Sequence, residues 1–143
     1  MPPPRQNRAY VTLLSALLTA FVLRVLAQLV QAYSDVAWLP PFEAWAAGGL
    51  PYPLLAAFQV IIIAAALEVI RKLSRGDMRP RRAASVWFLG LGAIYFVSMA
   101  FRLAAGLTFL ADNAWFGASL PAIFHLVLAA FVLTLGHFHW SKA

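Results

Sequence analysis

The chain has 143 residues, of which 63% are hydrophobic and 11% are charged, with a net charge of +6 and no cysteine. A soluble domain is about half apolar and about a quarter charged, so this composition favours a small protein whose solvent is largely lipid. The absence of cysteine excludes disulfides, thiolate metal sites, CxxC redox chemistry and covalent haem attachment.

The first long apolar run covers residues 10–31 and follows a short basic, proline-rich segment, residues 1–9. A basic start before an apolar stretch is also typical of a signal peptide. This run is longer than a typical signal-peptide core, and Arg24 interrupts it. We therefore interpret it as a membrane helix that is retained, preceded by a cytoplasmic tail.

The first loop is rich in proline and aromatic residues. Pro40-Pro41 can start a helix and Gly48-Gly49 can end one. Between them, Phe42 and Trp45 lie on one side of such a helix. This pattern predicts a short helix that lies in the membrane interface, where aromatic side chains are enriched.

Three more apolar runs follow, each close to the roughly 20 residues that a membrane crossing needs. They cover residues 51–70, 84–106 and 118–137, and a short tail, 138–143, ends the chain. The sequence therefore predicts an all-α fold, a bundle of four transmembrane helices over residues 10–137.

The positive charges indicate the orientation of this bundle. Nine of the eleven lysines and arginines fall in the two tails and the loop 71–83. The loops 32–51 and 107–117 have none. They hold three acidic residues instead: Asp35, Glu43 and Asp112. The positive-inside rule then predicts that both termini are cytoplasmic, in a bacterial-type inner membrane. The net positive charge thus reflects topology, and we expect no nucleic-acid partner.

A polar stripe runs along the outer half of the first helix. Its members are spaced i, i+4, i+7 and i+11, which places them on one helix face. They are Arg24, Gln28, Gln31 and Asp35. A charged stripe is costly in lipid unless other segments cover it.

The other three helices also carry polar side chains in this outer half, within roughly 6–12 Å of the outer surface at about 1.5 Å per residue. We predict a polar pocket in the outer leaflet that binds the anionic or carbonyl-bearing head of a quinone- or lipid-like molecule. Its residues are Arg24, Gln28, Gln59, Tyr95, Ser98, Arg102 and His125. His125 could exchange a proton near neutral pH.

A purely structural interpretation stands beside this one. The arginines could snorkel outward and pair with acidic residues of the outer loops. Those partners would be Asp35, Glu43 and Asp112. The glutamines could simply hydrogen-bond between helices, at about 0.6 kcal/mol each.

The remaining charged and histidine residues have simpler interpretations. Glu68 has Arg71 and Lys72 at i+3 and i+4, which predicts an ion pair at a helix end. His125 has no second histidine at its depth, so we expect no bis-histidine haem. His137 and His139 are spaced i, i+2, on opposite faces of a helix, so we expect no metal site.

The basic loop from Arg71 to Arg82 is expected to lie against anionic lipid head groups. A cytoplasmic protein that docks on this loop is the alternative.

One stretch resembles a known family. Arg24 in the first helix, then Phe42 and the run GLPYPLL at 49–55 before the second helix, are similar to the DoxX-like group of small four-helix bacterial membrane proteins. Members often carry an acidic residue in the second helix, followed by glycines. This chain has Gln59, followed by valine and isoleucine. The resemblance implies a four-helix bundle and a link to quinone-coupled oxidoreductases or membrane redox complexes.

Three hypotheses about function follow. The first is a non-enzymatic membrane subunit, in a homo-oligomer or a larger membrane complex, that holds a quinone- or lipid-like molecule. The second is an intramembrane oxidoreductase or isomerase that uses His125 with Arg24 and Arg102. The third is a small oligomeric transporter. The pocket assumes that the first and fourth helices are adjacent.

Overall fold

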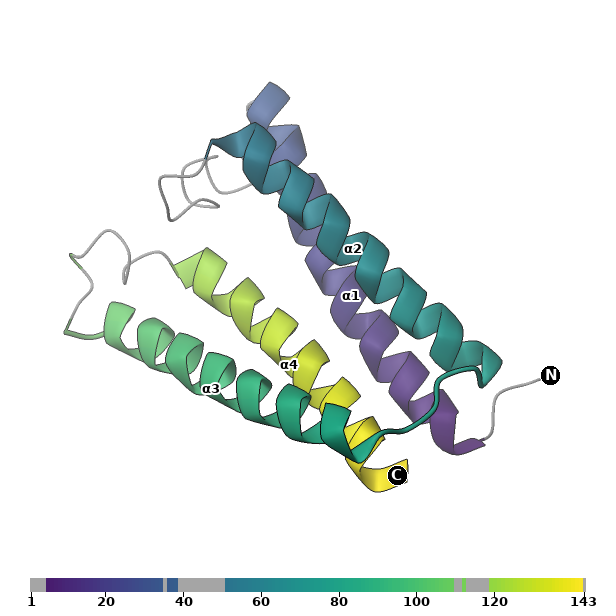
Figure 1. Cartoon of the computed structure of the whole chain (residues 1–143). Coiled ribbons are helices and arrows are strands. Elements are labelled where there is room, and N and C mark those ends of the chain that lie inside the picture. Colours follow the sequence, from purple (N-terminus) through teal and green to yellow (C-terminus); the bar gives the residue numbers. More distant parts are fainter. Residues whose placement is uncertain (1–4, 35, 39–50, 110–111, 113–118, 143) are drawn as a thin grey trace.

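The computed structural model describes residues 5–34, 36–38, 51–109, 112 and 119–142. Within these residues, the regular secondary structure consists of four α-helices, and each is long and apolar enough to cross a membrane. They are α1 (Arg5–Tyr33), α2 (Tyr52–Arg75), α3 (Arg82–Gly106) and α4 (Ser119–Lys142) (Figure 1). The prediction of an all-α chain with four candidate membrane spans is confirmed.

The helices extend past the predicted spans. α1 begins at Arg5, α2 continues to Arg75 and α4 continues to Lys142. The segments expected to be tails are therefore helical over 5–9 and 138–142. Hydropathy reports only the length that lipid covers, whereas a helix can continue into the aqueous boundary while its backbone hydrogen bonds remain intact. The predicted interfacial helix lies outside the described residues.

Local sequence signals explain both ends of α2. Pro51 precedes the helix and Pro53 lies in its first turn, where the missing N–H of proline has no cost. At the other end Gly76 adopts a left-handed conformation with φ of 74°. The Gly76 N–H donates to Leu73 O at 3.2 Å and the Asp77 N–H donates to Lys72 O at 2.9 Å. These two bonds form a Schellman motif, which stops the helix.

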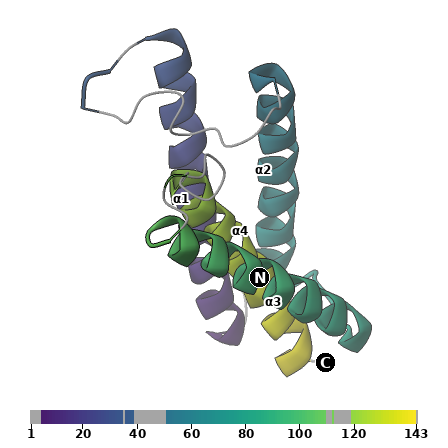
Figure 2. The same ribbon diagram turned by 90° about the vertical axis from the view of Figure 1, so that its left-hand side faces the viewer.

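The helices contact one another in the spatial order α2, α1, α4, α3. The pair α1–α2 and the pair α3–α4 converge at the end that carries both chain termini, here called the termini end (Figure 1). They diverge toward the opposite end, here called the distal end, and Figure 2 shows the two pairs from the side. The contact between α1 and α4 meets the condition on which the predicted pocket depended.

Side chains of three helices close the termini end. Leu14, Leu73 and Phe138 are fully or almost fully buried and form one apolar cluster. They come from α1, α2 and α4 respectively. The Tyr10 hydroxyl lies 2.8 Å from His137 Nδ1 and 2.8 Å from Ser141 Oγ, which ties the start of α1 to the end of α4. The two helix pairs are thus anchored to each other at this end.

Two glycines let α3 and α4 approach closely. A Cβ added at Gly92 would lie 3.0 Å from Leu133 Cδ2, and one added at Gly136 would lie 2.9 Å from the backbone nitrogen of Leu89. The nearby Gly90 does not take part in this contact, because a Cβ added there would meet nothing within 4 Å. Close approach at small residues is typical of helices that associate in lipid.

The outward faces of the helices are apolar. Val60, Ile61, Ile94 and Val97 are each exposed over at least 62% of their surface. A water-soluble bundle of this size would bury such side chains. Together with the helix lengths, this exposure is compatible with a multi-pass membrane protein.

Candidate functional site

The polar stripe of α1 faces the interior of the protein. Arg24, Gln28 and Gln31 are exposed over 8%, 0% and 8% of their surface, while leucines on the other faces of α1 remain exposed. Arg24 Nη1 donates to Gln28 Oε1 at 2.9 Å. Gln31 exchanges hydrogen bonds with the backbone of Val36 at 2.9 and 3.3 Å. Asp35, the last member of the stripe, lies outside the described residues.

Gln59 of α2 joins this stripe. It is only 3% exposed, and its Nε2 donates to Gln28 Oε1 at 3.3 Å. Within the described part of the chain, two buried amide atoms have no hydrogen-bond partner: Gln28 Nε2, a donor, and Gln59 Oε1, an acceptor. Most buried polar atoms in proteins are satisfied. Gln59 lines a small cavity, so its Oε1 is an acceptor for a molecule bound there.

α4 contributes His125 and Phe124 to the same region. The Tyr95 hydroxyl of α3 is hydrogen-bonded to His125 Nδ1, and the two rings meet edge to face with centroids 5.7 Å apart. The guanidinium carbon of Arg24 lies 5.9 Å from the centre of the Phe124 ring, within the range of a cation–π contact. Five of the seven predicted residues, drawn from all four helices, are therefore linked in two groups, Arg24–Gln28–Gln59 and Tyr95–His125.

A small cavity of about 90 Å³ lies between these groups. Three predicted site residues, Arg24, Gln59 and His125, line it from α1, α2 and α4. Its other walls are apolar: Phe21, Leu55, Phe58, Ile62, Pro121, Phe124 and Leu128. We call it the polar cavity, since the charged and hydrogen-bonding groups of the site meet there.

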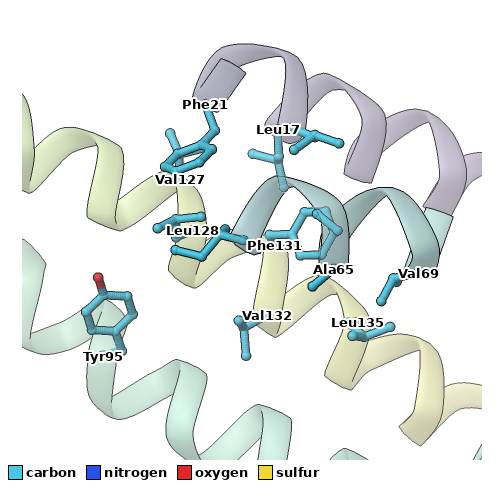
Figure 3. Close-up of a pocket in the computed structure, with 13 residues that line it drawn as sticks. Leu17, Phe21, Ala65, Val69, Tyr95, Val127, Leu128, Phe131, Val132 and Leu135 are labelled. Atoms are coloured by element: carbon cyan, nitrogen blue, oxygen red, sulfur yellow. The ribbon is translucent and has the colours of Figure 1, made fainter. Parts of the chain in front are cut away.

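A larger cavity of about 410 Å³ adjoins the polar cavity on the side of the termini. The two share Phe21, Ile62 and Leu128 as lining residues. Apart from Tyr95, every side chain that lines the larger cavity is aliphatic or phenylalanine, and Figure 3 shows the Tyr95 ring facing this space from α3. We call it the apolar cavity. Sequence reasoning missed it, because no residue pattern reports the distance between helix pairs.

Two predicted site residues lie elsewhere. Arg102 is only 3% exposed, and its Nη1 lies 3.9 Å from Met99 Sδ on its own helix. Ser98 is exposed. Neither is among the described residues that line the two cavities. Ser98 lies at the edge of the helix face that Tyr95 and Arg102 share, which explains why only those two turn inward.

The predicted ion-pair partners of the arginines are mostly outside the described residues. Glu43, like Asp35, is not described, and Asp112 is exposed. The predicted pair at the end of α2 is confirmed. Arg71 binds Glu68 through two hydrogen bonds of 2.9 and 2.6 Å, and Lys72 Nζ lies 4.0 Å from the same carboxylate.

The histidines near the end of α4 have separate structural partners. His137 meets Tyr10, whereas His139 Nδ1 accepts the backbone N–H of Arg81 at 3.1 Å and stacks on Phe88. They turn to different neighbours, as the i, i+2 spacing on a helix predicts. Among the described residues there is no group of three histidine, cysteine or acidic side chains that could hold a metal ion.

Comparison with family models, curated proteins and solved structures yields no match to this chain. The resemblance to the DoxX-like group therefore stays a prediction. The function has to be argued from the two cavities and the groups that line them.

Proposed function

We propose that this protein is a non-enzymatic membrane subunit that binds one amphipathic, quinone- or lipid-like molecule between its helix pairs. The polar head of the ligand lies in the polar cavity, and its apolar part lies in the apolar cavity. The observation that carries the proposal is the adjacency of a cavity of about 410 Å³ with apolar walls to one lined by Arg24, Gln59 and His125. An apolar volume with a few convergent polar groups is typical of ligand sites.

The hydrogen-bonding groups fit a ring that carries a carbonyl or a hydroxyl. Arg24 is a donor for a carbonyl oxygen, and Gln59 Oε1 is an acceptor for a hydroxyl. A buried acceptor that stays unsatisfied costs about 1–3 kcal/mol, so a ligand hydroxyl that donates to Gln59 Oε1 gains that energy. A quinone and its quinol present these two groups in turn.

We place both termini on the cytoplasmic side of a bacterial-type inner membrane, following the positive charges. The polar cavity then lies in the outer half of the membrane and the apolar cavity nearer its centre. The ligand head would sit beneath the outer surface. Assembly with further copies or with a membrane redox complex is part of the proposal, because a small binding subunit needs a partner that uses its ligand.

The test is to purify the protein in a mild detergent and identify bound small molecules by native mass spectrometry and organic extraction. Arg24→Ala should lose the bound molecule. Arg102→Ala is the matched control, because it removes a buried arginine that lines neither cavity. A bound molecule that is retained equally in both variants would contradict the proposal. A wild type that holds nothing, with both variants only less stable, would mean that the stripe is structural.

One observation favours an enzyme as the second candidate. Tyr95 and His125 form a hydrogen-bonded pair in which Tyr95 faces the apolar cavity and His125 the polar cavity. Such a pair can pass a proton to or from a bound carbonyl. An enzyme would convert the extracted ligand to a second species, and His125→Gln would abolish that conversion while the ligand stayed bound. The apolar walls of the larger cavity argue against a polar transport path.

A further inference from the structure

A third cavity, with a different character, lies at the termini end. It measures about 380 Å³ and is formed by the end of α2, the segment 76–81 and the start of α3, with His139 of α4 at its side. Its lining residues are Lys72, Asp77, Met78, Arg79, Arg81, Ala84 and His139. We call it the basic cavity. It shares no lining residue with the two cavities of the proposed function.

The charges around the basic cavity are unbalanced. Three cationic residues, Lys72, Arg79 and Arg81, line it together with one acidic residue, Asp77. Lys72 also approaches Glu68 at 4.0 Å. No ion pair joins Arg79 or Arg81 to an acidic side chain in the part of the chain that the structure describes. Three cations that converge on one cavity favour a ligand with a net negative charge.

The backbone adds to this preference. α3 begins beside the cavity, and its N-cap residue, Arg81, makes no side-chain hydrogen bond to the first turn. The free N–H groups of a first turn attract anions, phosphates above all. Arg81 is fixed in place by its backbone N–H, which donates to His139 Nδ1 at 3.1 Å. The cavity therefore has a positioned wall as well as a positive charge.

The surroundings indicate where the anion comes from. Trp87 in α3 and Trp140 in α4 are exposed over 67% and 46% of their surface, near the helix ends that form the cavity. Exposed tryptophans at the end of apolar helices are typical of the membrane–water boundary. Leu91, 58% exposed, lies one turn beyond Trp87 and continues an apolar surface along α3 from that boundary. A phosphate held in the basic cavity could therefore carry acyl chains that run along this helix.

We infer that the basic cavity binds the phosphodiester of an anionic lipid head group. The chemistry recognised is a phosphodiester head group with a net negative charge, which phosphatidylglycerol has and the zwitterion phosphatidylcholine lacks. This inference does not depend on the ligand of the other two cavities. It differs from a diffuse attraction between a basic loop and the membrane, in which every positive charge near the surface counts equally.

The test compares single charge removals on the folded protein in a neutral detergent. Binding of short-chain phosphatidylglycerol is titrated by tryptophan fluorescence for the wild type, Arg79→Gln and Arg75→Gln. Both arginines are exposed and close in sequence, but Arg75 does not line the cavity. We expect Arg79→Gln to weaken binding about tenfold and Arg75→Gln less than about threefold, since a direct contact to an ionised group is lost only in the first.

Two further probes fix the source of the phosphate. Short-chain phosphatidylcholine should bind at least about tenfold more weakly than phosphatidylglycerol, and glycerol 3-phosphate should not compete at equal concentration. Equal weakening by Arg79→Gln and Arg75→Gln would overturn the site in favour of diffuse attraction. Equal binding of the two lipids would overturn the charge preference. Competition by glycerol 3-phosphate as effective as the lipid would overturn the lipid source and assign the cavity to a soluble phosphate compound.

Discussion

The two surfaces of α4 differ in how they meet their neighbours. Against α3, α4 presents Gly136, which lies so close to Leu89 that even a Cβ would be crowded. Against α1 and α2, it borders an apolar cavity of about 410 Å³. One helix therefore takes part in one tightly packed interface and one incompletely filled interface.

The tightly packed interface contributes to stability, whereas the incompletely filled interface is available for binding. In lipid there is no hydrophobic gain from bringing helices together, so close packing is a main source of association energy. An unfilled interface forgoes those contacts, because atoms that line a void lack partners on one side. The α3–α4 pair should then behave as the rigid part of the protein. The boundary between α4 and the α1–α2 pair is the place where a second molecule can supply the missing contacts.

The largest expected effect comes from adding one methyl group to the tight interface. Gly136→Ala would place a Cβ 2.9 Å from the backbone nitrogen of Leu89, so α3 itself would have to shift. We expect the free energy of unfolding to fall by about 1–3 kcal/mol, as in overpacked cores. Thermal unfolding in detergent measures this change.

Gly90→Ala is the matched control for that substitution. It adds the same methyl group to the same helix pair, but a Cβ at Gly90 meets nothing within 4 Å. Alanine also has the higher helix propensity, so stability should stay the same or rise. If the two variants unfolded at the same temperature, the close contact between α3 and α4 would not contribute to stability.

A medium effect is expected from filling the loose interface. Ala66→Leu adds three carbon atoms at a position that is 7% exposed and lines the apolar cavity. The ligand-free protein should unfold at the same or a slightly higher temperature, because the added atoms find space. The bound molecule should be lost. Ala64→Leu, on the exposed face of α2, is the control and should keep it.

Ala66→Leu tests whether the interface between α4 and the α1–α2 pair is incompletely filled. A large loss of stability would mean that the apolar cavity is not available space, and the contrast with the α3–α4 interface would disappear. A ligand that stayed bound would place the binding site elsewhere in the protein.

The sequence predicted the number of helices and their approximate spans, because runs of about 20 apolar residues are a strong signal. It also predicted which residues face inward on α1, since Arg24 and Gln28 follow a helical period. Helix ends were less predictable. Arg5 and Lys142 are polar and look like tail residues, although the backbone stays helical through them.

The residues that line the polar cavity could be predicted in part, whereas the other cavity and the contacts between helices could not. Arg24, Gln59 and His125 do line one cavity, because similar depth on adjacent helices brings side chains together. The apolar cavity could not be predicted from the sequence. Leucines and valines give the same sequence pattern whether they pack against each other or line a cavity. The contact of Gly136 had a weak signal, a single glycine in the fourth apolar run. The bond between His139 and Arg81 depends on a turn that residue patterns do not specify.

The smallest effect should come from the link between α1 and α2. Gln59→Leu removes the 3.3 Å hydrogen bond to Gln28 Oε1, but that oxygen still accepts from Arg24 at 2.9 Å. Hydrogen bonds between membrane helices average about 0.6 kcal/mol, so we expect a change of that size in the free energy of unfolding. Combining Gln59→Leu with Gln28→Leu isolates the pairwise term. A coupling of several kcal/mol would show that the glutamine pair is a main source of the association between α1 and α2, and the stripe of α1 would then be scaffolding.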